Sequence, residues 1–372
     1  MQNLINLRHE FHQIPEIAFE EYRTKALVIK TLHQILGHEL HSDAIWKIQQ
    51  FTTSNAILVE YRGGKGSFRL FRADMDALPV SENSGCKFPS HHSGFMHACG
   101  HDVHITVLLG LIQAIKLNKP PKNLLFLFQP AEEGRGGAQS VLSEGIIQGY
   151  EISSAIALHV ASELPVGTIS SKSGIFFGIP QEFDVHFKGK SSHVAYPEKG
   201  INALQAGLNF LNLMHNEVEE LSKHERIIFH VGKMSAGVIR NVIPADCLLE
   251  GTHRSLKSDV RDSLNHMIKQ NAGIAAAEIN AEASVDYLCS YDPVINNQDL
   301  VFELMDKCQE LNLNYLEAET AMTGEDFGFF TTLYPGLLFW LGSGCIYPLH
   351  SDKFLPSDEC IEVGIKTMLS LA

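Results

Sequence analysis

Short, almost wholly apolar runs that alternate with helical stretches restrict the fold of this chain more than any other feature. The runs cover Asn55–Tyr61, Phe68–Ala73, Leu124–Phe128, Ala155–Val160 and Leu337–Leu341. A helical pattern at Val103–Leu117 separates two of them, and others lie near Gln139–Ile147 and Leu300–Leu311. Strands that are apolar at nearly every position are buried on both faces, so the pattern predicts an α/β sheet covered by helices.

The pattern changes after Gly174. Half-exposed strands and long helices then follow the order β-α-β-β-α-β, with elements expected at Glu182–Lys188, Asn202–Leu221, Ile227–Gly232, Val242–Gly251, Ser258–Ala276 and Ala281–Tyr287. This is the order of a ferredoxin-like α+β unit. Because 372 residues exceed the usual size of a single core, we expect a discontinuous catalytic domain at 1–173 and 290–372, interrupted by an inserted domain at 174–289.

Composition excludes several classes of function. The net charge of −14 argues against nucleic acid, whose phosphates need Lys and Arg. The first residues, MQNLINLRHEFHQ, lack the apolar run of a signal peptide, and apolar runs such as LLGLIQAI are too short to span a membrane. The 7 cysteines are odd in number and irregularly spaced, which does not suit a disulfide framework. We therefore expect a cytoplasmic protein that binds neither nucleic acid nor membrane.

Metal-binding residue types gather where the expected strands of the first domain end, and just ahead of the helix at Val103. They are Asp74, Asp76, Cys99, His101, Glu132, Glu133, His159 and His350. In an open α/β sheet, ligands bind at the carboxyl ends of the strands. Thiolate, imidazole and carboxylate groups are ligands of zinc and other divalent metals. The sequence therefore predicts a metal site at this edge of the sheet.

The adjacent pair Glu132 and Glu133 is the most informative motif. It follows an apolar strand and Pro130, and it precedes Gly134-Arg135-Gly136-Gly137, which suits a tight turn beside a reacting centre. Two neighbouring carboxylates can divide the work of a hydrolase. One binds metal, and the other takes a proton from water and passes it to the leaving nitrogen. The spacing alone allows either assignment.

These motifs together resemble a family of metallo-amidohydrolases that includes hippurate hydrolase, the indole-acetyl-amino acid hydrolases and N-acetyldiaminopimelate deacetylase. The similar segments run in order through the chain: RHEFHQIPE at 8–16, RADMDALP at 72–79, HACGHD at 97–102, QPAEEG at 129–134, ALHV at 157–160, MTGEDF at 322–327, and His350. The resemblance implies an α/β fold with a mixed sheet and an inserted ferredoxin-like lid domain. It also implies a homodimer formed through that lid.

The resemblance assigns roles to the residues at the matching positions. It implies two divalent metal ions per subunit, Zn²⁺ or Mn²⁺ with Co²⁺ and Ni²⁺ as further options, bound by Cys99, His101, Glu133, His159 and His350, with Cys99 as the bridge. Glu132 becomes the general base, with the reverse order of the two glutamates still open. Either Asp74 or Asp76 orients a ligand histidine.

The resemblance also marks the inserted domain as a source of substrate contacts. His193 matches a histidine that contacts the substrate, and Asn241 and Arg254 match positions near the substrate carboxylate. One departure affects this segment: Ser191 and Ser192 stand where the family pattern has two glycines. Because serine tolerates positive φ poorly, the backbone of this loop is in question.

The implied reaction is removal of an acyl group from the nitrogen of an amino acid. The best match is N-acetyl-L,L-diaminopimelate, giving L,L-diaminopimelate and acetate for lysine biosynthesis, and the alternative is hippurate or another N-acyl amino acid or dipeptide. Two other classes compete: a thiol enzyme with Cys99 as nucleophile beside His97 or His101, and a non-catalytic amino-acid-binding protein. A thiol enzyme would keep its activity without metal, and binding alone does not need a pair of glutamates.

Overall fold

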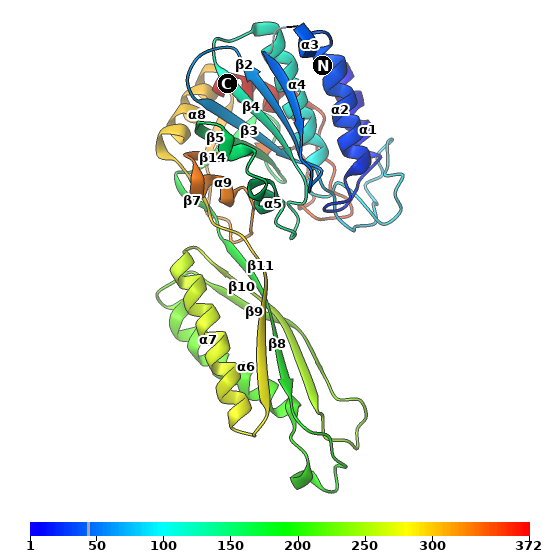
Figure 1. The fold of residues 1–372 in the computed structure, drawn as a ribbon, viewed down its shortest axis with the longest axis vertical. Helices are drawn as coiled ribbons and strands as arrows, with labels where there is room; N and C mark the ends of the chain where they lie inside the picture. Colours follow the sequence, from blue (N-terminus) through cyan, green and yellow to red (C-terminus); the bar gives the residue numbers. More distant parts are fainter. Residues whose placement is uncertain (43–44) are drawn as a thin grey trace. The chain divides into compact units, whose positions relative to one another are not determined.

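The computed structural model describes residues 1–42 and 45–372, which form two compact units (Figure 1). The first unit spans Met1–Phe176, Val294–Thr320 and Glu325–Ala372. The second unit comprises Phe177–Pro293 and Ala321–Gly324. Each unit has its own sheet and its own buried core.

A mixed sheet forms the centre of the first unit. Within the described residues its strands follow the order β1-β2-β4-β3-β5-β14-β12-β7, and β6 lies between β14 and β13. They are β1 (Trp46–Gln50), β2 (Ile57–Arg62), β3 (Phe68–Asp74), β4 (Asn123–Gln129), β5 (Ile152–Ala161), β6 (Thr168–Ser171), β7 (Gly174–Phe177), β12 (Val294–Asn296), β13 (Asn314–Glu317) and β14 (Gly336–Gly342). Strands β4, β3, β5 and β14 are parallel, whereas β1 and β2 run antiparallel to their neighbours. The expected α/β fold with a mixed sheet is confirmed.

Helices pack against this sheet because its central strands are apolar on both faces. Every residue of β4 is buried, and Phe71, Phe126 and Leu109 share one continuous core. The helices of the unit are α1 (Gln2–His12), α2 (Tyr22–Leu36), α3 (Glu39–Ser42), α4 (His101–Asn118), α5 (Gly137–Ser143), α8 (Gln298–Glu310), α9 (Gly328–Leu333) and α10 (Glu359–Leu371), with a 3₁₀ turn at Ile147–Gly149. Helix α4 contacts α1, α2 and α10.

The start of α4 is set by Gly100, whose φ of +80° lies in the left-handed region. A Cβ at this position would come within 2.4 Å of Cγ2 of Val160 in β5. Only glycine therefore lets the loop turn into the helix this close to the sheet. Because Gly100 approaches Val160 so closely, α4 begins at His101 directly beside β5.

The second unit is an antiparallel sheet with two helices on one face (Figure 1). Its elements are β8 (Ile179–Lys188), a 3₁₀ turn at Pro197–Lys199, α6 (Ala203–Ser222), β9 (Ile228–Ala236), β10 (Asp246–Ser255), α7 (Ser258–Ala277) and β11 (Glu282–Ser290). The strand order is β11-β8-β10-β9. Phe183 and Phe187 of β8 pack against Phe210 of α6 and Ile268 of α7. The expected order of these elements, β-α-β-β-α-β, is confirmed.

Among the predicted elements, one strand and one helix differ most from the structure in their bounds. The strand expected from Val242 begins only at Asp246, since Pro244 cannot donate a ladder hydrogen bond. The helix expected over Gln139–Ile147 ends at Ser143, and Gly145, with φ of +75°, separates it from the following 3₁₀ turn. The short strands β1, β6, β7, β12 and β13 were not predicted, because each has five residues or fewer and no clear alternation.

Candidate metal centre

Cys99 lies where ligands from separate parts of the first unit meet. Its Sγ is 3.4 Å from Nε2 of His159 in β5 and 3.3 Å from Nε2 of His350 in the loop after β14. Ligands that lie about 2.0–2.3 Å from one tetrahedral zinc ion are separated from each other by roughly 3.5 Å. The spacing of these sulfur and nitrogen atoms therefore fits a shared metal ion.

The two buried histidines are oriented by backbone carbonyl groups. Nδ1 of His101 donates to the carbonyl oxygen of Asp76 at 2.8 Å, and Nδ1 of His159 donates to that of Val160 at 2.8 Å. In both rings the unprotonated Nε2 remains as the ligand atom. Nε2 of His101 is buried without a hydrogen-bond partner among the described residues. A metal ion would satisfy this nitrogen, because buried polar atoms are seldom left unpaired.

Asp76 fixes the backbone of both glutamates. One carboxylate oxygen accepts from the N–H of Glu132, and the other accepts from the N–H of Glu133, each at 3.0 Å. The preceding residue, Ala131, has φ of +59°, in the left-handed region that alanine rarely adopts. Such strain persists where the surroundings impose it, as at functional sites. The turn therefore delivers both carboxyl groups to the same place.

The remaining distances complete the cluster. Nε2 of His350 is 3.5 Å from Oε1 of Glu133. Three groups have ligand atoms that lie within 4.8 Å of one another: Cys99 with His101 and His159, Cys99 with Glu133 and His350, and His101 with both glutamates. The structure thus brings together every expected ligand and Glu132. Overlapping groups with shared members suit a pair of neighbouring ions.

The two adjacent glutamates differ in their electrostatic surroundings. Burial, together with the charges of Glu325 and Glu133, raises the pKa of Glu132 well above its usual value. Burial also acts on Glu133, but the neighbouring imidazoles of His350, 3.5 Å away, and of His101 outweigh it and lower the pKa of Glu133. Glu133 therefore stays ionised, as a ligand must, whereas Glu132 holds a proton readily.

Asp74 occupies a different position from Asp76. It accepts from Nδ1 of His104 at 2.5 Å and from Nη1 of Arg72 at 2.7 Å, and it lies 3.8 Å from Nε2 of His101. Nε2 of His104 in turn accepts from the backbone N–H of Val160 at 2.9 Å. His104 was missed in the sequence, although its spacing of three residues from His101 places both on one face of α4.

Arg72 extends this network away from the ligands. Its Nη2 donates to Asp326 at 2.7 Å, and its Nε donates to the side chain of Gln129 at 3.0 Å. Arg72, Asp74 and Asp326 are all completely buried. The motif MTGEDF therefore contributes a buried carboxylate that holds the β3 and β4 strand ends together.

In the second unit, the structure brings two of the three expected substrate contacts together. His193 pairs with Val242 in an isolated bridge, and the N–H of Val194 donates to the carbonyl oxygen of Asn241 at 3.1 Å. Among the described residues with positive φ, neither Ser191 nor Ser192 appears, so this loop needs no glycine there.

Arg254 lies at the other end of the second unit's sheet. It pairs with Pro180 of β8 and with Ile228 of β9, whereas the loop of His193 and Asn241 lies beyond Asp246, where β10 begins. The 10 residues of β10 span roughly 30 Å at about 3.3 Å each. One unit therefore cannot place Arg254 and His193 on the same small substrate.

Comparison with known proteins gives this site a family. The model of peptidase family M20/M25/M40 matches residues 70–372. The chain belongs to this family. It is 35% identical to the N-acetyldiaminopimelate deacetylase of Shouchella clausii, over 100% of this chain and 97% of the relative. It is also 35% identical to the enzyme of the same name from Oceanobacillus iheyensis, over 100% of this chain and 99% of the relative.

A solved structure supports the same assignment. The YXEP protein of Bacillus subtilis, described as a dinuclear metal binding peptidase from the M20 family, superposes with a TM-score of 0.84 at 26% identity. The superposition covers 100% of this chain and 96% of that protein. The M20 chain contains no helix, in the part that the structure describes, long and apolar enough to cross a membrane.

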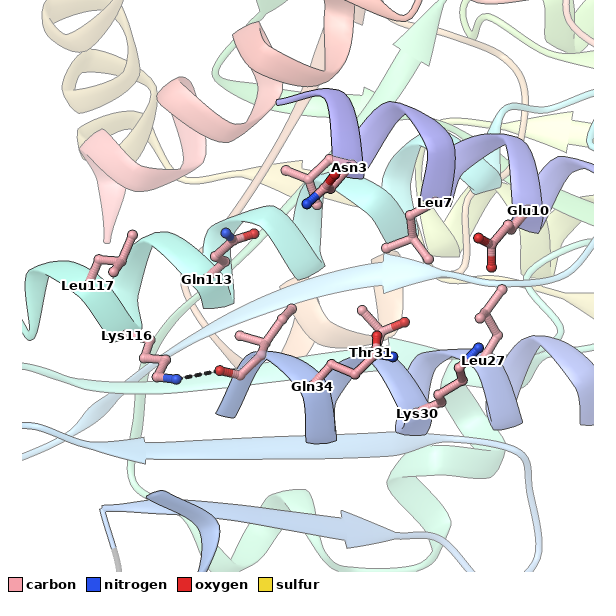
Figure 2. Close-up of a pocket in the computed structure, with 12 residues that line it drawn as sticks. Asn3, Leu7, Glu10, Leu27, Lys30, Thr31, Gln34, Gln113, Lys116 and Leu117 are labelled. Carbon is pink, nitrogen blue, oxygen red and sulfur yellow. Dashed lines mark hydrogen bonds between the residues drawn. The ribbon is translucent and has the colours of Figure 1, made fainter. Parts of the chain in front are cut away.

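A surface pocket of about 430 Å³ lies between α1, α2 and α4 of the M20 chain (Figure 2). Nζ of Lys116 closes one end by donating to the carbonyl oxygen of Ile35 at 2.5 Å. The other lining residues include Asn3, Leu7 and Gln34. None of the described lining residues belongs to the candidate metal centre, so this pocket is separate from it.

Proposed function

We propose that this M20 chain binds two divalent metal ions and hydrolyses N-acetyl-L,L-diaminopimelate to L,L-diaminopimelate and acetate. The observation that carries the proposal is the position of the Cys99 sulfur, within 3.4 Å of His159 and 3.3 Å of His350. His101 and Glu133 complete the proposed ligand set. The substrate is taken from the relatives' names, and Zn²⁺ and Mn²⁺ are the metals that we expect first.

The ions, when bound, supply Lewis acidity and a nucleophilic water at neutral pH. Glu132 is positioned to take the proton of the attacking water and to deliver it to the leaving nitrogen. Asp76 holds Glu132 in place through the backbone, and the Asp76 carbonyl fixes the ring of His101. Asp74 accepts a hydrogen bond from His104, and His104 accepts one from Val160 of β5. These bonds fix α4 against β5 next to the proposed ligands His101 and His159.

The substrate contacts support a homodimer whose active sites are shared. The chain enters and leaves the second unit at the end that carries Arg254, since β8 begins there and Gln181 pairs with Ser290 of β11. His193 lies at the opposite end, roughly 30 Å away along the strands. We propose that the second unit serves as a lid and dimerisation domain, and that His193 and Asn241 reach the active site of a second copy.

The surface beside His193 suits burial in a partner. Val238 is 99% exposed and Ile239 is 61% exposed, and both lie in the loop that carries Asn241. Val194 and Tyr196 are also exposed next to His193. Exposed apolar side chains that gather at one place mark interaction sites. A second copy of this chain would cover them and bring His193 with them.

We also propose that the enzyme works in the cytoplasm. All 7 cysteines are free thiols in the structure. Cys99 must be a thiolate to bind metal, and a reducing compartment protects it from oxidation. The net charge of −14 agrees with a small-molecule substrate and no nucleic-acid partner.

A substrate panel with metal analysis tests the proposed function. The panel contains N-acetyl-L,L-diaminopimelate, hippurate, N-acetyl-L-methionine and small dipeptides. We expect N-acetyl-L,L-diaminopimelate to have the highest kcat/KM. A clearly higher kcat/KM for hippurate would contradict the proposed substrate. Dialysis against a chelator should abolish turnover, and added Zn²⁺ or Mn²⁺ should restore it. Full activity in metal-free protein would favour a thiol enzyme based on Cys99.

A further inference from the structure

A second group of metal-ligand types lies outside the candidate metal centre. It joins His12, the last residue of α1, to Glu82 and Cys86 in the loop between β3 and α4. Nε2 of His12 is 3.2 Å from Oε1 of Glu82, and Sγ of Cys86 is 3.2 Å from the same oxygen. All three ligand atoms lie within 4.8 Å of one another.

The ring of His12 is oriented as metal-binding histidines are. Its Nδ1 donates to Oδ2 of Asp102 at 2.9 Å, and the same oxygen accepts from Nε of Arg8 at 2.8 Å. His12 and Asp102 are completely buried. A carboxylate that takes the proton of one ring nitrogen leaves the other nitrogen as a ligand, which is the usual arrangement behind a zinc-bound histidine. Here that other nitrogen points at Glu82 and Cys86.

The contacts in this group are as short as those in the candidate metal centre, and they converge on one oxygen of Glu82. In the candidate metal centre, the sulfur of Cys99 lies 3.4 and 3.3 Å from its histidine nitrogens. In the His12 group both contacts are 3.2 Å. Imidazole, carboxylate and thiolate together form a zinc-type donor set, and three protein ligands leave one position for water. The Glu82 side chain is only 6% exposed, and Cys86 is half-buried.

We propose that His12, Glu82 and Cys86 form an additional divalent-metal site, with zinc as the preferred ion. The ion would tie the loop before Met96 to α1. This loop leads directly into Cys99 and His101, and its residue Phe88 already stacks on His9 of α1 with ring centroids 3.5 Å apart. The site does not depend on the substrate proposed above.

Metal retention distinguishes this site from a plain ion pair, because a protonated His12 could make the same contacts with Glu82. The wild-type protein and Cys86→Ser are loaded with Zn²⁺, passed through a desalting column and measured by mass spectrometry of the metal. We expect wild type to retain one more ion per chain than Cys86→Ser. Cys289→Ser, a half-buried cysteine of the second unit, is the matched control and should retain as many ions as wild type. Equal retention by wild type and Cys86→Ser would overturn the proposal.

Cobalt spectroscopy gives a second readout that separates the two metal sites. Cys99→Ser removes the thiolate of the candidate metal centre, so any thiolate-to-Co²⁺ charge-transfer band that remains must come from another cysteine. We expect the band to persist in Cys99→Ser and to disappear in the double variant Cys99→Ser/Cys86→Ser. Absence of the band in a folded Cys99→Ser protein, checked by circular dichroism, would refute the site. If the candidate metal centre does not bind its ions, wild type should still retain one more ion per chain than Cys86→Ser.

Discussion

The carboxylate of Asp76 accepts the backbone N–H of Glu132 at 3.0 Å. Its second oxygen accepts the N–H of Glu133, and its carbonyl oxygen fixes His101. One residue therefore positions the proposed base and two of the proposed ligands. It does so without needing to touch metal or substrate itself.

Replacement of Asp76 by Asn should damage the centre while leaving the fold intact. The amide nitrogen of Asn cannot accept a hydrogen bond, so the side chain at position 76 would lose its bond to the N–H of either Glu132 or Glu133. Partners that orient metal ligands typically contribute a factor of about 10–100 in metal affinity or activity. Metal titration and steady-state kinetics of Asp76→Asn measure both effects, and unchanged values for both would contradict this role.

The two glutamates should respond differently to removal of their charge. Glu132→Gln should keep its metal and lose kcat by about a hundred-fold or more, because the proton carrier is gone. Glu133→Gln should instead lose metal, since a neutral amide is a weaker ligand. Metal content and kcat of the two variants, measured side by side, check the assignment. An empty site in Glu132→Gln with a loaded one in Glu133→Gln would reverse the roles.

The buried ion pairs of Arg72 with Asp74, Glu325 and Asp326 should be important for stability. Arg72→Met leaves three buried carboxylates without their counter-ion, which typically costs about 3–5 kcal/mol in the free energy of unfolding. Arg69→Met is the control on the same strand, because Arg69 pairs with Glu303 at a half-exposed position and should cost about 1 kcal/mol. Urea denaturation of both variants makes the comparison. Equal losses of unfolding free energy in Arg72→Met and Arg69→Met would contradict the importance of burial.

The proposed sharing of active sites predicts that two variants, each inactive alone, regain activity when they are mixed. In a mixed dimer of His193→Ala with Glu132→Gln, one site would have an intact Glu132 together with the partner's His193. After complete random exchange about a quarter of all sites should be active, since half of the dimers are mixed and each has one competent site. Activity of the mixture, with exchange followed by differently tagged subunits, provides the measurement. No recovery despite proven exchange would place His193 in its own subunit's site or in a structural role.

Local patterns were sufficient to predict the main strands and the metal-binding residue types. Strand β4 is recognisable because every position is apolar, and the glutamate pair is recognisable because it follows that strand directly. The parallel strands β3, β4, β5 and β14 deliver their ends to one edge of the sheet, so residues far apart in the chain meet there.

Relationships that depend on strand register and on distant partners could not be predicted in this way. Arg72 interrupts an apolar run, and its buried partners include Asp326, which lies 254 residues away in the chain. Arg254 and His193 looked like members of one substrate site, but the register of β10 with β8 places them at opposite ends of the sheet. A pairing of this kind is set by tertiary contacts, which a single sequence does not encode as a local pattern.

The pairing of Gln181 with Ser290 has a consequence for engineering. Strand β8 leaves the first unit and β11 returns to it as immediate neighbours, so the ends of the intervening segment meet. Segments whose ends lie together can be excised, transplanted or circularly permuted with little disturbance to the host. A gene fragment for this segment could therefore be exchanged between M20 enzymes as a cassette, giving chimaeras that combine the first unit of one enzyme with the second-unit segment of another.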